Sequence, residues 1–508
     1  MLRTQNNSDG TIAGLSLGGR DLSVVAGLPF RTAAVYALLF AVAFCFYSAL
    51  WSSAPVMESD SWTYLTAAQD LSDFHIDRLQ ERTPGYPLLL LLTGSSQSPS
   101  RTLFCVSLLM HFASIWLLAS VLYSAGVREV MLTLFAFILL LPPYVEPAAY
   151  VLSENLTEAM LVAGFVTFIF WILQNRTTWI FISGLAIGYA ALTRPTYQLL
   201  AFAMAGYILV ANFLLHSVLK WKDVIKGCLI LVCGSIVITT GYAFVNYRSV
   251  GYFGATPQLG FALTQKTLRV VERLPDEYAV IREALIRARN SALISGAEHT
   301  GYSYIDGTVL ELTKVTGLNR AQLSNTLLRI NLLLIQKAPA HYLQEVVWAF
   351  GSYWFPSSGE LANFNSRAVQ LLWAVINFLL IGGFALNLIV LVAAGIICKR
   401  FVVLCDSRPV GELRAIQLQG LIYGLAGTIV IYSAVLTCLV QMGLPRYRVP
   451  TDALIIFMLF LGTHLWRCLV DFLGATFLSR PGHGPQSIAN SPKYAKYSTS
   501  IAQATQKG

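Results

Sequence analysis

Ten apolar runs, each near the length of a membrane span, constrain the fold of this chain most strongly. A helix needs about 20 apolar residues to cross the hydrocarbon core of a bilayer. The helix is favoured there because it bonds all its backbone polar groups internally. We therefore predict an all-α integral membrane protein with about ten transmembrane helices, at 31–51, 102–125, 129–145, 154–173, 177–193, 195–216, 227–246, 368–397, 417–440 and 451–472.

Composition supports a membrane protein and argues against nucleic-acid binding. Hydrophobic residues make up 56% of the chain and charged residues 12%, whereas soluble domains carry about 25% charged residues. The net charge of +9 comes from short basic clusters between apolar runs, not from one phosphate-binding face. The eight cysteines lie mostly in or beside apolar runs without CxxC or zinc-type spacing, which indicates core residues and not a disulfide framework.

The distribution of basic residues predicts the orientation of the chain. Cytoplasmic loops of membrane proteins carry an excess of Lys and Arg. The first apolar run lacks a small-residue cleavage site, so we interpret it as a retained span. Both termini are then expected in the cytoplasm of a cell that carries this protein in its inner membrane. The cytoplasmic connections would hold Arg128, Arg176, Lys220, Lys222, Lys226, Lys399, Arg400, Arg408 and Arg414.

The same pattern divides the chain into five parts. A cytoplasmic segment (1–30) precedes a membrane domain (31–249), whose first outer loop (52–101) is polar. An extracytoplasmic loop (250–367) has apolar and charged residues at helical spacing, which predicts amphipathic helices on the membrane surface or over a cavity. Membrane helices (368–472) and a disordered cytoplasmic tail (473–508), rich in Pro, Gly, Ser and Lys, complete the chain.

Asp60, in the first outer loop, has two interpretations. It or Ser59 can cap the helix predicted for SWTYLTAAQDL. Alternatively, it lies at the outer membrane boundary as a general base, a role for which Glu58 is the nearest rival. Asp70, Asp73 and Asp77 fit a solvated helix face better.

The segment ERTPGYPLLLLLTG predicts a turn followed by a helix too short to cross the membrane. Arg82 enters this turn at the depth of a lipid phosphate, and Tyr86 begins the short helix. Arg82 is either an interfacial anchor or a phosphate contact.

Two further segments place charge at the outer ends of spans. In YVLSENLTEAM, Glu154 and Glu158 share one helix face, and Glu158 lies deep enough in an apolar span to indicate a function. A Glu154–Arg194 pair is expected at the mouth of a cavity. In MGLPRYRVPTDAL, the residues Arg446, Tyr447 and Arg448 are either interfacial anchors or phosphate ligands.

Together these segments resemble the GT-C superfamily of membrane glycosyltransferases. The nearest branch holds protein O-mannosyltransferases, the aminoarabinose transferase of lipid A and lipopolysaccharide galacturonosyltransferases. The similarity covers roughly residues 31–470 in order and spacing. It rests on SDSWTYLTAAQDL, RTPGYPLLLLL, VLSENLTEAML, SGLAIGYAALTRPT, NYRSVGYFGATPQLG and GLPRYRVPTDALIIF.

The resemblance implies a transferase that uses a polyprenyl-phosphate-linked sugar on the non-cytoplasmic face. Asp60 occupies the position of the family's catalytic acid. Many relatives have an Asp-Glu pair there, whereas Ser61 follows Asp60 here, so Glu58 and Glu154 are candidates for the second carboxylate. The expected phosphate- and substrate-binding residues are Arg82, Tyr86, Arg194, Arg446, Tyr447 and Arg448.

The expected reaction is a single displacement that inverts the anomeric carbon. Asp60 would take the proton of an acceptor hydroxyl on a lipid, glycan or protein, and the arginines would stabilise the departing phosphate. We expect no cofactor and no obligatory metal, because no metal-ligand cluster is visible in the sequence. Two other classes stay open. One is a lipid-linked glycan polymerase or ligase, with its essential residues in 250–367. The other is a transporter or flippase, against which the chain has no evident two-fold repeat.

Overall fold

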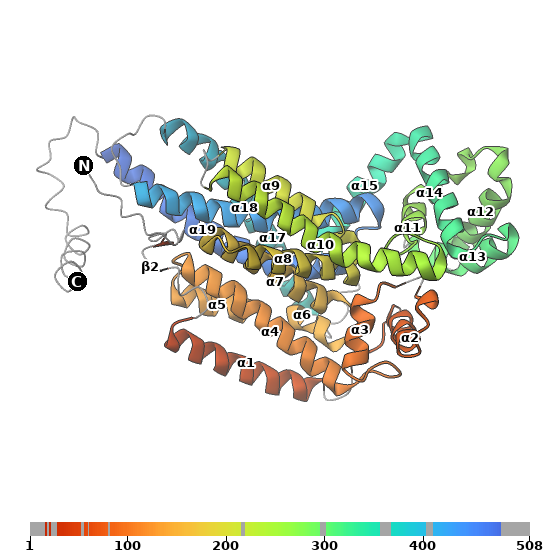
Figure 1. Ribbon diagram of the computed structural model, residues 1–508, viewed down its shortest axis with the longest axis horizontal. Coiled ribbons are helices and arrows are strands. Elements are labelled where there is room, and N and C mark those ends of the chain that lie inside the picture. Colours follow the sequence, from red (N-terminus) through yellow and green to blue (C-terminus); the bar gives the residue numbers. More distant parts are fainter. Residues whose placement is uncertain are drawn as a thin grey trace, which may run out of the picture.

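The computed structural model describes residues 16–17, 20–21, 28–51, 55–58, 60–79, 82–214, 219–294, 301–355, 367–402 and 410–478. Most of the N-terminal segment and residues 479–508 of the predicted disordered tail lie outside these ranges. The first residues of that predicted tail, 473–478, instead continue the last helix, Val449–Leu478. Among the described residues the fold is helical, apart from a short antiparallel strand pair and an isolated β-bridge (Figure 1). The prediction of an all-α membrane-type protein is confirmed at this level.

The elements up to the end of the first membrane domain follow in chain order. They are β1 (Ser16–Leu17), β2 (Arg20–Asp21), α1 (Phe30–Leu50), α2 (Ser61–Ser72), η2 (Ile76–Arg78), α3 (Gly85–Leu92), α4 (Arg101–Ser124), α5 (Glu129–Leu139), α6 (Pro142–Val145), η3 (Glu146–Ala149), α7 (Glu154–Gln174), α8 (Thr177–Thr193), η4 (Pro195–Tyr197), α9 (Leu200–Leu214) and α10 (Trp221–Val250), where η marks a 3₁₀ helix.

A second group of elements forms the outer helical unit and the C-terminal helices. The outer helical unit, as we call residues 259–354, holds α11 (Leu259–Thr267), η5 (Leu268–Arg273), η6 (Asp276–Tyr278), α12 (Ala279–Ile294), α13 (Gly301–Thr316), α14 (Arg320–Lys337) and α15 (Pro339–Trp354). The chain then continues with α17 (Arg367–Val402), α18 (Val410–Val440), η7 (Pro445–Tyr447) and α19 (Val449–Leu478).

In the described part of the chain, eight helices are long and apolar enough to cross a membrane. They correspond to eight of the ten predicted runs. The run at 129–145 is a helix pair, Glu129–Leu139 and Pro142–Ala149, bent by 67°. The run at 177–193 is the helix α8, which is 17 residues long. The number of spans therefore lies below the predicted ten by these criteria of length and composition.

The bend between α5 and α6 has a chemical cause. Pro143 has no backbone N–H to donate to the carbonyl of Leu139, so the helical ladder stops there. His111 Nε2 lies 2.9 Å from that carbonyl and must carry the hydrogen, because a carbonyl oxygen only accepts. The Tyr47 hydroxyl donates to the next carbonyl, of Leu140, at 2.6 Å. The freed acceptors are thus bonded by side chains of α1 and α4.

Small residues allow α8 to pack closely against α10. A Cβ atom at Gly184 would lie 2.3 Å from the carbonyl oxygen of Leu231, and one at Gly188 would lie 3.0 Å from that of Ser235. Helices in lipid associate largely through such close packing, since lipid removes most of the hydrophobic driving force between them. The contact fixes the end of α8, where Arg194 follows.

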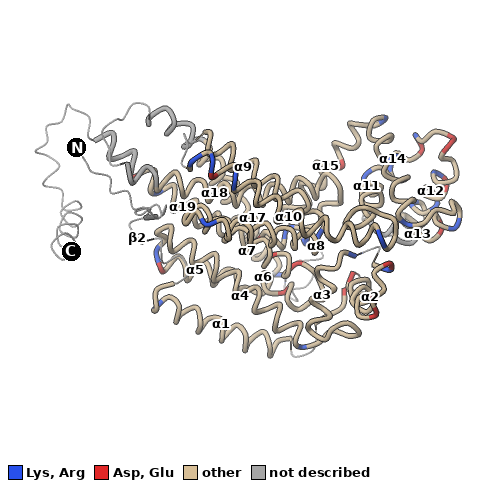
Figure 2. The backbone as a smooth tube through the Cα atoms, viewed as in Figure 1, with Lys and Arg blue, Asp and Glu red and all other residues tan. Residues whose placement is uncertain are grey.

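The outer helical unit has its own core and caps one end of the helix bundle (Figure 1). This core includes Phe261, Leu285, Leu312, Leu327 and Leu334. Figure 2 shows few charges along the long helices, whereas Lys, Arg, Asp and Glu gather on the outer helical unit and near α2. The helical pattern predicted in 250–367 is confirmed, although Pro339 divides its last stretch into α14 and α15.

Candidate functional site

A short β-bridge brings together two segments that are about 90 residues apart. Val56 pairs in parallel with Tyr150, through bonds from Val56 N to the Ala149 carbonyl (2.7 Å) and from Val151 N to the Val56 carbonyl (3.1 Å). The Ser61 hydroxyl donates to the Val151 carbonyl at 2.9 Å. These contacts hold the start of α2, with Asp60, beside the start of α7, with Glu154.

Gly85 brings the third segment to the same place. A Cβ atom at this position would lie 2.6 Å from the Leu192 carbonyl oxygen, so α3 approaches the end of α8 more closely than a side chain permits. The Tyr189 hydroxyl also donates to the Gly85 carbonyl at 3.0 Å. As a result Arg82, just before α3, and Arg194, just after α8, both reach the region between Asp60 and Glu154.

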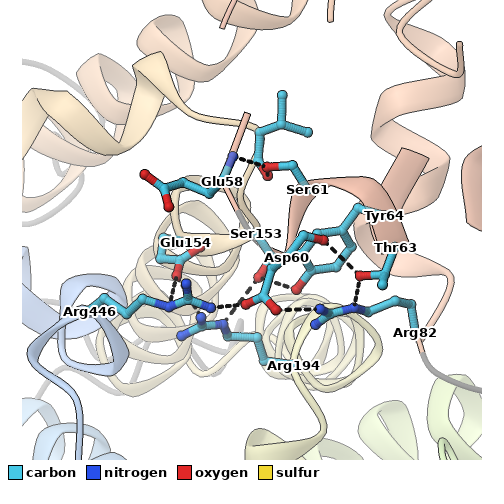
Figure 3. A network of polar contacts seen from close by, with 11 residues as sticks. Glu58, Asp60, Ser61, Thr63, Tyr64, Arg82, Ser153, Glu154, Arg194 and Arg446 are labelled. Carbon is cyan, nitrogen blue, oxygen red and sulfur yellow. Dashed lines mark hydrogen bonds and ion pairs between the residues drawn. The ribbon is translucent and has the colours of Figure 1, made fainter. Parts of the chain in front are cut away.

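Asp60 is held between two arginines (Figure 3). Arg82 Nη2 donates to Oδ1 at 2.8 Å, and Arg446 Nη2 donates to Oδ2. Arg82 is itself positioned by a bond from Nε to Thr63 Oγ1 at 2.7 Å and by stacking over the Tyr64 ring. Asp60 occupies the N-cap position of α2, but its side chain makes no capping bond. Asp60 therefore stands at the predicted cap position, but its carboxylate does not cap the helix.

Glu154 and Arg194 form a second ion pair next to the first. Arg194 Nη2 donates to Glu154 Oε1 at 2.7 Å, and Arg194 Nε donates to Ser153 Oγ at 3.1 Å. The predicted pair is confirmed. Arg446 Nε lies 3.7 Å from the same Glu154 oxygen, so Arg446 links the two carboxylates. Glu154 is 2% exposed, and no described group hydrogen-bonds to its Oε2.

We call the two carboxylates and three arginines the network: Asp60, Glu154, Arg82, Arg194 and Arg446. When all five groups are ionised, the network has one excess positive charge. Burial raises the pKa of Asp60, but Arg82 and Arg446 outweigh this effect and lower it to about 2. Asp60 is therefore ionised at neutral pH. An anion that entered this network would find guanidinium donors already held in position, which is the arrangement that recognises phosphate.

Three predicted site residues take other positions. Tyr447 lies against two members of the network, with its ring 5.5 Å from the Arg194 guanidinium and 5.7 Å from that of Arg446. Arg448 turns away from the network: it donates to Asp452 at 2.7 Å and to the Trp354 carbonyl at 2.7 Å. Tyr86 is buried against the Tyr64 ring, with the ring centroids 5.0 Å apart.

Two other carboxylates from the sequence analysis, Glu58 and Glu158, lie outside the network. Glu58 is exposed at the entry to α2, where its backbone N–H donates to Ser61 Oγ at 2.8 Å. Glu158 is buried one turn further along α7, with Oε1 3.0 Å from His111 Nδ1. Because His111 also bonds to Leu139, the pair ties α7 to the α5–α6 bend.

A cavity of about 400 Å³ borders the network and shares Glu154 and Arg446 with it. Its other walls come from the α5–α6 bend, from the first turns of α17 and from the start of α19. Within the described ranges, no group of three or more His, Cys, Asp and Glu side chains is arranged to hold a metal ion.

Sequence reasoning missed several residues that position the network. Tyr64 bonds to Ser153 Oγ at 3.1 Å and lies under Arg82. Its position one helical turn after Asp60 is a signal that could have identified it. No comparable signal exists for Thr63 or Ser153, whose partners come from distant segments.

Comparison with known proteins adds no family assignment: no family model matches the sequence, and no curated protein does either. The resemblance to the GT-C superfamily therefore stays a prediction.

Proposed function

We propose that this protein is a membrane glycosyltransferase of the GT-C type. It would move a sugar from a polyprenyl-phosphate donor to an acceptor hydroxyl on the non-cytoplasmic membrane face. The observation that carries this proposal is the network itself: Asp60 and Glu154 held among three arginines, at the end of long apolar helices and beside a cavity.

The donor's chemistry matches the location of the arginines. Its polyprenyl tail stays in hydrocarbon, which keeps its phosphate near the membrane surface. Arg82, Arg194 and Arg446 carry more positive charge than Asp60 and Glu154 neutralise, so one phosphate charge can be accepted there. The phosphate gains negative charge as its bond to the sugar breaks, and prearranged donors stabilise that charge in the transition state.

Asp60 would act as the base, and donor binding would strengthen it. A carboxylate with a pKa of about 2 is a weak base, because two guanidinium groups stabilise its ionised form. A donor phosphate competes for Arg446 and Arg82, which raises the proton affinity of Asp60 when donor is present. The base is thus most effective in the complex that needs it.

The proposed step is a single displacement at the anomeric carbon. The acceptor oxygen forms a bond to this carbon while the bond from carbon to phosphate oxygen breaks, and the phosphate leaves with the electron pair. The acceptor proton passes to the Asp60 carboxylate. Attack opposite to the leaving group inverts the configuration, and the products are the glycosylated acceptor and free polyprenyl phosphate.

Reconstitution into vesicles tests this proposal. Purified protein is given polyprenyl phosphates that carry labelled sugars, together with extracts of envelope lipids, glycans and proteins as acceptors. The expected result is label in an acceptor product, matched by an equal amount of free polyprenyl phosphate. Movement of labelled lipid or sugar across the bilayer without release of polyprenyl phosphate would overturn it in favour of a transporter. Growth of a lipid-linked glycan chain that depends on the outer helical unit would favour a polymerase.

A further inference from the structure

The cavity beside the network is lined by charged side chains of both signs. Two of these, Glu154 and Arg446, belong to the network with its excess positive charge. Glu154 presents a buried oxygen, Oε2, with no hydrogen-bond partner among the described residues. The cavity therefore adjoins the network at Glu154 and Arg446.

Two carboxylates near one hydroxyl also line the cavity. Glu58, Glu146 and Tyr150 all line it, and the Tyr150 hydroxyl donates to Glu146 Oε1 at 3.0 Å. Burial, followed by the charges of Glu146 and Glu58, raises the pKa of Tyr150 above its ordinary value. Glu58 and Glu146 therefore both place negative charge near the Tyr150 hydroxyl.

Arg448, which also lines the cavity, does not offset this charge. Arg448 lines the cavity together with Asp452, and Arg448 Nε donates to Asp452 Oδ1 at 2.7 Å. Each charge in this pair neutralises the other. The guanidinium is held further by bonds to the Trp354 carbonyl and, at 3.4 Å, to Asn377 Oδ1.

Aromatic rings complete the cavity wall. Tyr144 and Trp373 meet edge to face with their ring centroids 5.7 Å apart, and both line the cavity. Pockets for small ligands typically occupy about 300–1,000 Å³ and combine aromatic surface with a few polar groups. The cavity, at about 400 Å³, has the size and the surfaces to hold a sugar.

We infer that this cavity binds the sugar of the donor and selects sugars that carry no negative charge, excluding uronic acids. The inference rests on the proposed function. The phosphate would lie at the network, and the sugar would extend toward Glu58 and Glu146, where hydroxyl or amino groups can donate to the carboxylates. A sugar carboxylate there would meet two like charges, which is costly.

A donor panel tests the selection. Three donors share one polyprenyl phosphate and carry a neutral hexose, an amino hexose or a hexuronic acid. We expect wild-type protein to transfer an uncharged or amino sugar at least about tenfold faster than the hexuronic acid. In the double variant Glu58→Gln/Glu146→Gln the ratio should fall toward one, because amides keep the shape and remove the charge. Glu283→Gln, on an exposed part of α12, is the control and should leave the ratio unchanged.

The possible results distinguish the charge selection from the proposed glycosyl transfer on which it rests. Hexuronic acid transferred as fast as the others would overturn the charge selection while leaving glycosyl transfer intact. No transfer from any donor would remove the proposed function, and this inference with it. Binding gives a second readout on wild-type protein alone. Hexose 1-phosphate should raise the melting temperature more than hexuronic acid 1-phosphate, and an equal effect of the two would contradict the selection.

Discussion

At the residue scale, Asp60 illustrates how one group can be both a structural partner and a proposed catalyst. Its carboxylate bonds to arginines from two segments, which holds the start of α2 against η7. Because the pKa of Asp60 in the folded protein lies below its ordinary value, ionised Asp60 stabilises the fold. This contribution is complete above about pH 4 and is lost as the pH falls toward 2.

The same pKa predicts the pH dependence of transfer. Since Asp60 stays ionised in the protein without donor, kcat/KM for the proposed transfer should show no acid limb from this carboxylate between about pH 8 and pH 5. Arg446→Met removes one of the charges that lower the pKa of Asp60, so any limb from Asp60 should move to higher pH. The measurement is the pH profile of kcat/KM in vesicles. The low pKa of Asp60 would be contradicted if the wild-type kcat/KM already fell on the acid side above pH 5 and if that fall moved to still higher pH in Arg446→Met.

Removing Arg194 should destabilise the protein through the charge that it leaves behind. Arg194→Met removes the nearer of the two cations beside the buried carboxylate of Glu154 and leaves Arg446 Nε, 3.7 Å away. The loss should therefore approach but not exceed the cost of breaking a buried ion pair, about 3–5 kcal/mol. The double variant Arg194→Met/Glu154→Gln should recover a large part of this loss, because it buries no unpaired charge. Unfolding in detergent measures both.

An exposed ion pair provides the control for this comparison. Arg287 and Glu311 are 2.9 Å apart on the outer helical unit, with side chains 58% and 43% exposed. Arg287→Met should cost no more than about 1 kcal/mol. Equal losses for Arg287→Met and Arg194→Met would contradict the buried character of the Arg194–Glu154 pair.

At the element scale, the site depends on close contacts between short and long helices. The element α3 is only eight residues long, yet its contact with α8 determines where Arg82 enters the network. Gly85 makes that contact possible, because any side chain would meet the backbone of Leu192 and Thr193. Backbone atoms cannot move aside as a flexible side chain can.

Substituting Gly85 tests this packing directly. Gly85→Ala should displace α3, reduce transfer and cost about 1–3 kcal/mol through overpacking. Gly382→Ala is the matched control, since no atom lies within 4 Å of the added Cβ and Ala favours a helix. Transfer assays and thermal unfolding compare the two variants. Normal activity and stability in Gly85→Ala would show that α3 is not positioned by this contact.

Most of the long helices could be predicted from the sequence, because apolar length and helical spacing are local properties, whereas the bend in the run at 129–145 was not predicted. What could not be predicted is pairing over long distances: Asp60 and Arg446 are 386 residues apart. The Glu154–Arg194 pair could be anticipated, since two adjacent spans end on one side. Arg448 could not be distinguished from Arg446 by pattern, because its bond to Asp452 depends on how η7 leads into α19.

At the scale of the whole molecule, apolar helices and charged helices are segregated. The long helices form most of the body, and the outer helical unit carries much of the charge at one end (Figure 2). The network lies toward that end, where α2, α3 and the start of α7 meet (Figure 1). That the site and the outer helical unit face away from the cytoplasm stays a prediction.

Cysteine labelling tests the orientation. In a cysteine-free background, Asp73→Cys at the end of α2 should react with a membrane-impermeant maleimide in intact cells. Lys222→Cys at the start of α10 should react only after permeabilisation, because basic loops are retained in the cytoplasm. Both positions are exposed. The reverse pattern would invert the topology and place the network on the cytoplasmic face.

The most direct test of the central claim is the rate of sugar transfer by Asp60→Asn in reconstituted vesicles. Asn keeps the size of the side chain and removes its ability to take a proton, so transfer should fall by about 10²–10⁴-fold. Asp73→Asn, on an exposed part of the same segment, should transfer at the wild-type rate. Undiminished transfer by Asp60→Asn would contradict the proposed role of Asp60 as the base.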